Sequence, residues 1–181
     1  AAGAEHSLGL KADGSIVAWG CGGIYHDAPC IVPLSNTGFV AIAAGGFHSL
    51  GLKADGSIVA WGICAGPNGD SQCHVPSPNS GFAAVAAGYW HNLALKGDSS
   101  IVAWGCDNPD NYGQCNVPSP NTGFVAVAGG HYLSLAIRAV VSGLSIAPQQ
   151  RAVSQSASLT TFAVAIAGSG TMNWSAAVTP G

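Results

Sequence analysis

The stretch Gly38–Gly62, GFVAIAAGGFHSLGLKADGSIVAWG, decides the fold class because it is one copy of a repeat. A second copy, GFAAVAAGYWHNLALKGDSSIVAWG, occupies Gly81–Gly105, and shortened copies occupy residues 1–20 and 123–138. Trp19, Trp61 and Trp104 mark the same place in three copies and lie 42 and 43 residues apart. A period of this length is typical of solenoids, propellers and repeat arrays.

Each full copy predicts short strands joined by turns. Phe39–Ala44 is apolar throughout and flanked by glycines, which favours a strand buried on both faces. His48–Lys53 alternates apolar with small or polar residues, as a strand does. Asp55-Gly56 is a strong hairpin signal and leads to a third strand at Ser57–Trp61. A fourth strand, limited to an edge by its proline, is expected at Val32-Pro33, Val75-Pro76 and Val117-Pro118.

The repeated phrase HSLGLKADGSIVAWG, followed by Cys-x-Val-Pro, resembles the regulator of chromosome condensation repeat family. The Val-Pro and Ala-Ala-Gly phrases are especially similar to bacterial members, among them a secreted propeller that inhibits β-lactamases. The resemblance implies blades of four antiparallel strands, usually seven to a ring. We therefore expect an all-β fold with a partial β-propeller of about three and a half four-stranded blades. The expected blades are residues 1–38, 39–81, 82–123 and, in part, 124–138.

The repeat pattern stops after Arg138. Residues 139–148 are expected to be a linker, and residues 149–181 a truncated immunoglobulin-like β segment. The phrase FAVAIAGSGTMNWSAAVTPG resembles the first half of immunoglobulin-like modules of bacterial surface proteins, and holds too few strands for a sandwich of about seven. Since the chain does not begin with Met, we interpret it as a mature or excised piece of a longer precursor.

Only 7% of the residues are charged, and the net charge is −3. Four of the five basic residues occupy one repeat position, so no basic patch for nucleic acid is expected. These four are Lys11, Lys53, Lys96 and Arg138. No apolar run approaches the ~18–20 residues of a membrane span.

The six cysteines form three pairs, each nine positions apart in the same loop of its repeat. The pairs are Cys21/Cys30, Cys64/Cys73 and Cys106/Cys115. One disulfide per repeat is the simplest interpretation, and it places the chain in an extracellular or cell-surface compartment. Zinc is the alternative, but His26 and His74, which lie near cysteines, do not share a repeat position.

Other candidate chemistry is sparse. His6, His48 and His91 recur and form either a ring of metal ligands or a row of packed structural histidines. The second is favoured because the fourth copy has Leu133 there. The loop Asp107–Asn111 offers oxygen ligands for calcium without the spacing of a known calcium loop. The sequence contains no nucleophile elbow, phosphate loop or dinucleotide motif. We therefore do not expect the chain to be an enzyme or to bind a cofactor or another small molecule.

The copies differ in their cysteine loops and in the two residues before the recurring histidine. Variable loops on a rigid scaffold often carry binding, and aromatic side chains are typical anchors. The candidate binding residues are Tyr25, Phe47, Tyr89, Trp90, Tyr112 and Tyr132. Alternatively, these aromatics only fill gaps between blades.

The sequence favours a non-enzymatic extracellular structural or protein-binding module. A partial ring leaves apolar faces and strand edges open, so copies are expected to complete one another as a filament or a closed oligomer. The alternative function is a secreted inhibitor of an enzyme such as a β-lactamase. The nuclear nucleotide-exchange role of the family is disfavoured by the cysteine pairs and the low charge. Trp19, Trp61 and Trp104 are expected to be buried between blades.

Overall fold

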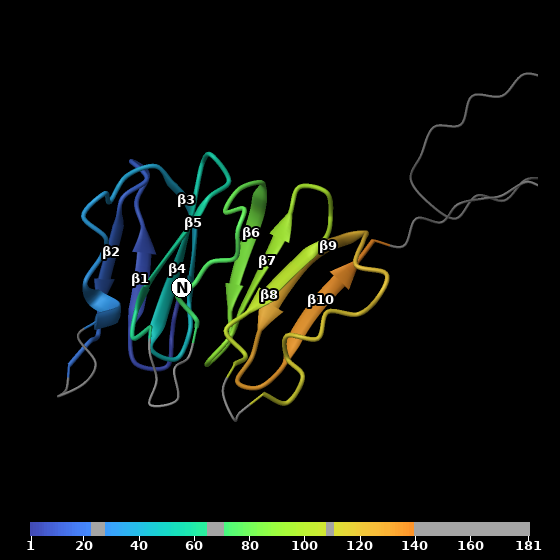
Figure 1. Ribbon diagram of the computed structural model, residues 1–181. Coiled ribbons are helices and arrows are strands. Elements are labelled where there is room, and N and C mark those ends of the chain that lie inside the picture. Colours follow the sequence, from blue (N-terminus) through green and yellow to red (C-terminus); the bar gives the residue numbers. More distant parts are fainter. Residues whose placement is uncertain (23–27, 65–70, 108–110, 140–181) are drawn as a thin grey trace, which may run out of the picture. The chain divides into compact units, whose positions relative to one another are not determined.

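The computed structural model describes residues 1–22, 28–64, 71–107 and 111–139, which belong to one compact unit, Ala1–Ser142. Four small antiparallel sheets follow one another along this unit (Figure 1). They are β1 (Ser7–Leu10) with β2 (Ile16–Trp19); β3 (Phe39–Ala44), β4 (His48–Lys53) and β5 (Ile58–Gly62); β6 (Phe82–Ala87), β7 (Asn92–Lys96) and β8 (Ile101–Trp104); and β9 (Phe124–Gly129) with β10 (Ser134–Arg138). A single 3-10 turn, η1 (Ala28–Cys30), accompanies the strands of the described ranges. The expected immunoglobulin-like segment and nearly all of the linker lie outside the described residues.

The hairpin between the second and third strands of each repeat forms as the Asp-Gly signal predicts. Asp55 Oδ1 accepts hydrogen bonds from the backbone amide of Ser57, at 2.9 Å, and from its hydroxyl. Gly56 has a φ of +79°, a conformation that glycine adopts without steric cost. The third copy makes the same turn although Ser99 replaces the glycine, and Ser99 takes a φ of 66°. The turn is therefore set by the aspartate as well as by the glycine.

The expected fourth strand does not form, and the sheets have two or three strands each in the described ranges. The amide of Val75 donates to the carbonyl of Cys73, 3.1 Å away, and so turns back on its own segment instead of pairing with a strand. An asparagine side chain occupies the outer edge of the third strand instead. Asn79 accepts a hydrogen bond from the Ile58 amide and donates one to the Ile58 carbonyl, both at 2.8 Å. Asn36 and Asn121 hold Ile16 and Ile101 in the same way.

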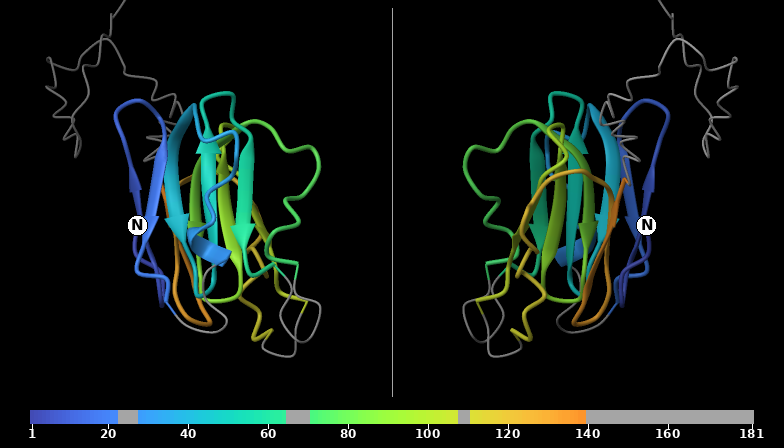
Figure 2. Two further views of the ribbon diagram at one scale, coloured as in Figure 1. Left: turned by 90° about the vertical axis from the view of Figure 1, so that its left-hand side faces the viewer. Right: turned by 90° about the vertical axis from the view of Figure 1, so that its right-hand side faces the viewer.

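The hydrophobic core lies between neighbouring sheets, which stack face to face (Figure 2). Trp61 of the second sheet packs on Leu8 and Ile16 of the first. Its indole N–H also donates to the carbonyl of Pro29, in the cysteine loop of the first repeat, at 3.0 Å. Trp104 packs on the second repeat in the same manner. Each tryptophan thus fastens its own repeat to the one before it.

The expected burial of all three tryptophans is wrong for Trp19. Trp61 and Trp104 are each 7% exposed, whereas Trp19 is 55% exposed. The physical reason lies in the stacking, because the cover of each buried indole comes from the preceding repeat. In the described residues, Trp19 belongs to the first copy and has no such cover.

The loops and the cations of the repeat behave as the sequence predicts. Disulfides join Cys21 to Cys30, Cys64 to Cys73 and Cys106 to Cys115, each within one loop. The ammonium of Lys53 lies 4.1 Å from the centre of the Phe39 ring, and the guanidinium of Arg138 lies 4.6 Å from that of Phe124. Lys96 approaches Phe82 similarly. These cations are therefore parts of the repeat.

Candidate protein-binding surface

The variable residue pairs lie in the turn between the first and second strands of each repeat. In the second repeat, the amide of Gly45 donates to the carbonyl of His48 at 2.8 Å and closes a tight turn around Gly46 and Phe47. The third repeat closes the same turn around Tyr89 and Trp90. Gly3 and Gly130 close the corresponding turns of the first and fourth repeats. Each repeat therefore presents its two variable residues at the same end of its sheet.

The turns of neighbouring repeats are bonded to one another. The amide of Ala4 donates to the carbonyl of Gly45, at 3.2 Å, and the amide of Tyr89 donates to that of Gly130, at 3.1 Å. A Cβ on Gly88 would lie 2.7 Å from the Gly130 carbonyl oxygen, closer than Cβ atoms are found, so glycine is required there. The four turns together line a shallow cavity of about 260 Å³.

Aromatic side chains from three repeats form a continuous row at this end of the sheets, which we call the aromatic surface. It consists of Phe47, Tyr89, Trp90, Tyr112, His131 and Tyr132. The Phe47 ring centre lies 5.2 Å from that of Trp90, and Tyr89 lies 4.2 Å from His131 in the next repeat. His131 stacks on Tyr132 at 4.0 Å, and Tyr132 meets Tyr112 of the third cysteine loop at 5.1 Å.

The aromatic surface fills the gaps between repeats and also faces solvent. Phe47, Tyr89 and Trp90 are half-buried by their contacts with one another. Tyr132 is 39% exposed, and Tyr112 is 70% exposed. The ring contacts between repeats agree with the gap-filling interpretation, and a role in binding stays a prediction. Tyr25, the remaining candidate, lies outside the described residues.

His131 is the member of the aromatic surface that the sequence analysis did not select. It stands at the position of Tyr89, two residues before Leu133, which replaces the recurring histidine. Alignment of the variable pairs alone would have placed it beside the tyrosine of the previous repeat. Its contact with Tyr89 depends on the packing of one repeat on the next.

The recurring histidines form a buried row that joins each repeat to the next. The Nε2 atom of His48 lies 2.7 Å from Asn92 Oδ1, so it carries the proton and donates, since a carbonyl oxygen only accepts. His6 bonds Ser49 at 2.9 Å, and His91 bonds Ser134 at 3.0 Å. Each histidine thus has its own partner one repeat away. The expectation of packed, hydrogen-bonded histidines is confirmed.

Burial sets the ionisation of this row. It lowers the pKa of His48 to about 4, and it lowers the pKa of His6 and of His91 below the usual value. The neighbouring histidines add to the effect on His48, because a second positive charge nearby is unfavourable. At neutral pH the row is therefore uncharged.

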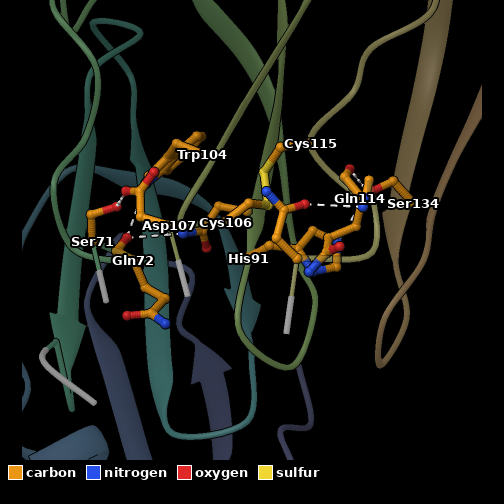
Figure 3. Close-up of a disulfide and its surroundings, with 12 residues drawn as sticks. Ser71, Gln72, His91, Trp104, Cys106, Asp107, Gln114, Cys115 and Ser134 are labelled. Carbon is orange, nitrogen blue, oxygen red and sulfur yellow. Dashed lines mark hydrogen bonds between the residues drawn. A yellow bond between two sulfur atoms is a disulfide. The ribbon is translucent and has the colours of Figure 1, made fainter. Parts of the chain in front are cut away.

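The carboxylates do not converge on a common site in the described ranges. Asp13, Asp55 and Asp98 are exposed turn residues whose pKa is lowered by the hydroxyl of the serine two positions on. Asp107 accepts a hydrogen bond from Ser71 of the previous cysteine loop (Figure 3). The central positions of the candidate calcium loop, residues 108–110, lie outside the described residues. Within the described ranges, no three metal-ligating side chains cluster.

Comparison with known proteins identifies the repeat. Residues 1–23, 39–69 and 82–114 match the family model of the Regulator of chromosome condensation (RCC1) repeat. The chain has no significant match among curated proteins. Among the described residues, none forms a helix with the length and apolar character needed to cross a membrane.

Several solved structures share the fold at low sequence identity. The CRINKLY WD40 ectodomain of the Arabidopsis thaliana receptor kinase ACR4 matches with a TM-score of 0.57 and 24% identity, over 76% of this chain and 44% of that chain. Prp20p of Saccharomyces cerevisiae matches with a TM-score of 0.57 and 22% identity, over 74% and 41%. Human WBSCR16 matches with a TM-score of 0.54 and 18% identity, over 75% and 42%. The chain spans less than half the length of each of these structures. It carries β-propeller repeats of the regulator of chromosome condensation type.

Proposed function

We propose that this chain is a non-enzymatic, extracellular protein-binding module that holds its partner on the aromatic surface. The observation that carries the proposal is the row of six rings that continues across three stacked repeats. The rings of Tyr112 and Tyr132 are exposed. The backbone of Tyr112 lies in a loop closed by a disulfide, and that of Tyr132 lies in a hydrogen-bonded turn. Rigid aromatic anchors lose little conformational freedom on binding, so they dominate many protein interfaces.

The disulfides and one solved structure support the extracellular location, and the partners of two solved structures support protein binding. Three disulfides suit an oxidising compartment, and a related fold forms the ectodomain of a plant receptor kinase. Proteins with this fold are described as binding other proteins: yeast RCC1 is bound by Kap60, and Prp20p has binding properties to Gsp1p and histones. Those partners belong to those proteins. For this chain, the support extends to protein binding as a class.

The test is an affinity capture from extracellular protein, in which the chain is compared with the double variant Tyr112→Ser, Tyr132→Ser. We expect at least one protein to be retained by the chain and lost from the double variant. Leu34→Ser is the matched control, because Leu34 is fully exposed and lies outside the aromatic surface. A partner, once purified, that binds the double variant and the unchanged chain equally would overturn the proposal.

An enzyme inhibitor is the alternative, and it would use the same surface. The sequence resemblance to a secreted β-lactamase inhibitor suggests class A β-lactamases as the first enzymes to assay. The inhibitor alternative predicts that the chain lowers hydrolysis of a chromogenic substrate in proportion to its concentration. It also predicts that the Tyr112→Ser, Tyr132→Ser variant does not. If the β-lactamase hydrolyses the substrate at its full rate in the presence of micromolar concentrations of the chain, the inhibitor alternative is wrong. The proposal of a protein-binding module is not affected by that result.

We further propose that copies of the chain associate head to tail, because the two ends of the repeat array expose complementary faces. Leu135 on β10 is 62% exposed, whereas its counterpart Leu93 is 2% exposed and buried against the next repeat. Trp19 is exposed at the other end, and its counterpart Trp61, in the second repeat, covers Leu8 of the first repeat. A second copy that placed Trp19 on Leu135 would reproduce the contact between repeats.

Such an interface is heterologous, so it gives a filament unless the rotation between copies closes a ring. Light scattering at micromolar concentration should show species larger than one chain. The variants Trp19→Ser and Leu135→Asp should each abolish them, whereas Leu34→Asp should not. A single-chain mass at all concentrations would overturn self-association and leave the aromatic surface untouched.

A further inference from the structure

A second cavity, of about 210 Å³, lies between the third repeat and β10. Its apolar wall includes Leu93, Ile101, Val117, Phe124 and Ala136. The aromatic surface contributes none of its residues to the lining of this cavity. The cavity is therefore distinct from the aromatic surface, although Leu135, which the proposed association uses, is also one of its lining residues.

The repeat itself shows what fills the equivalent place. One repeat earlier, a single core cluster holds Leu50, Ile58, Val75, Phe82 and Ala94 around Trp104. The five apolar residues of this cluster correspond in sequence to Leu93, Ile101, Val117, Phe124 and Ala136. The core cluster of the third repeat contains no tryptophan among the described residues. The apolar residues that line the cavity thus correspond to those that surround Trp104 one repeat earlier.

The polar partner of the indole also recurs. The indole N–H of Trp104 donates to the Gln72 carbonyl at 2.9 Å (Figure 3). The side-chain amide of Asn92 donates to the same oxygen, also at 2.9 Å. In the next repeat, the hydroxyl of Ser134 donates to the carbonyl of Gln114 at 2.7 Å. An indole placed in the cavity as Trp104 is placed above Gln72 would point its N–H at the Gln114 carbonyl. The cavity therefore offers an apolar wall and a positioned acceptor.

The strand beside the cavity has an open edge. β4 and β7 are central strands, each paired on both sides, whereas β10 pairs with β9 alone in the described residues. The strand that carries the tryptophan pairs antiparallel with β7, so that Trp104 lies opposite Asn92. Ile-Val-Ala-Trp occurs in this chain at residues 16–19, 58–61 and 101–104, and each of these forms the third strand of its own repeat.

We propose that the edge of β10 and its cavity form a docking site for an extended, tryptophan-ended strand of another polypeptide. The strand would pair antiparallel with β10, opposite Ser134, and place its indole in the cavity as Trp104 is placed one repeat earlier. Main-chain hydrogen bonds along the edge supply affinity, and the indole site supplies the side-chain specificity of strand addition. The preferred ligand carries β-branched and small residues before the tryptophan, as in Ile-Val-Ala-Trp. This site is separate from the aromatic surface and does not depend on it.

The probe is a fluorescein-labelled peptide, Ser-Ile-Val-Ala-Trp-Gly, which copies Ser100–Gly105. Binding to the full chain is measured by fluorescence anisotropy. We expect saturable binding that weakens by more than about tenfold when the peptide tryptophan is replaced by alanine. Replacement of the indole N–H by sulfur, in benzothienylalanine, should weaken binding by about three- to tenfold through the lost hydrogen bond. Equal binding of the tryptophan and alanine peptides, or no binding of either, would overturn the proposal.

A variant that fills the cavity from within tests the location. Ala136 is exposed and lines the cavity, so the ring of Ala136→Phe occupies the indole site. We expect this variant to lose peptide binding while it keeps the cooperative unfolding of the unchanged chain. Ala136→Leu, a smaller filling residue, is the second variant in case the phenylalanine disturbs folding. Val125→Phe is the matched control, because Val125 is exposed on β9 and does not line the cavity. Peptide binding that survives both Ala136 variants places the site elsewhere and refutes the proposal.

Discussion

The recurring histidine illustrates how one residue position ties two repeats together. His48 is completely buried, donates to Asn92, and has no described partner for its Nδ1 atom. Protonation would place an unpaired charge beside the other two histidines of the row. The native state therefore resists protonation, whereas the unfolded chain takes up protons near the ordinary pKa of about 6.5.

The stability of the chain should consequently fall as the solution is acidified. Since the pKa of His48 is lowered to about 4 in the folded state, its contribution is present above about pH 6.5 and is lost progressively down to about pH 4. We expect the free energy of unfolding in urea to decrease by about 1 kcal/mol per pH unit across this window. His48→Gln keeps a donor and does not titrate, so its pH dependence should be flatter. An equally steep dependence in this variant would contradict the assignment.

At the scale of the element, an asparagine side chain replaces the expected fourth strand. Asn79 bonds both the amide and the carbonyl of Ile58, on the outer edge of β5. Asn79→Ala removes both bonds and leaves a partly buried edge unsatisfied, which should lower the free energy of unfolding by about 1–3 kcal/mol. Asn116→Ala serves as control, since Asn116 is exposed. Equal stability of the two variants would show that water replaces the asparagine at no cost.

The cysteine loop is a second element whose contribution can be measured. The bond between Cys64 and Cys73 closes a loop with a sequence separation of nine residues. By the chain-entropy model, replacement of both cysteines by serine should lower the free energy of unfolding by about 2–3 kcal/mol. Non-reducing digestion and mass spectrometry should recover the linked peptides from the unchanged chain. Recovery of free thiols would contradict both the bond and the oxidising compartment.

On the scale of the whole repeat unit, stability comes from the stacking of one sheet on the next. Trp61 is 7% exposed between the first and second repeats, whereas Trp19 is 55% exposed. Trp61→Ala should lower the free energy of unfolding by about 3–5 kcal/mol, the range for buried aromatic residues. Trp19→Ala, measured at a concentration where the chain is a monomer, should cost less than about 1 kcal/mol. Similar losses in both variants would mean that neighbouring repeats do not bury the indole.

The sequence by itself determined the features that each copy of the repeat carries. The repeat period, the strands, the Asp-Gly hairpins and the partners of the six cysteines follow from short-range pattern and from comparison of the copies. These features depend on residues close together in the chain, where turn chemistry and alternation act directly. Even the substitution of Gly56 by Ser99 left the hairpin unchanged, because the aspartate remained.

Only the tertiary structure decided the features that depend on neighbouring repeats. Three features depend on which sheet stacks on which: the exposure of Trp19, the contact of His131 with Tyr89 in the aromatic surface, and the cavity beside β10. The three tryptophans occupy the same place in the sequence pattern, so the pattern predicts the same burial for each. The burial of each indole depends, however, on whether a preceding repeat covers it. The Val-Pro segments likewise have the composition of an edge strand. Their own amides bond within local turns, however, and the edge of the third strand is bonded by an asparagine side chain instead. That asparagine lies 20 or 21 residues along the chain from the isoleucine that it bonds. Contacts between residues that far apart are set by packing, which the local pattern does not encode.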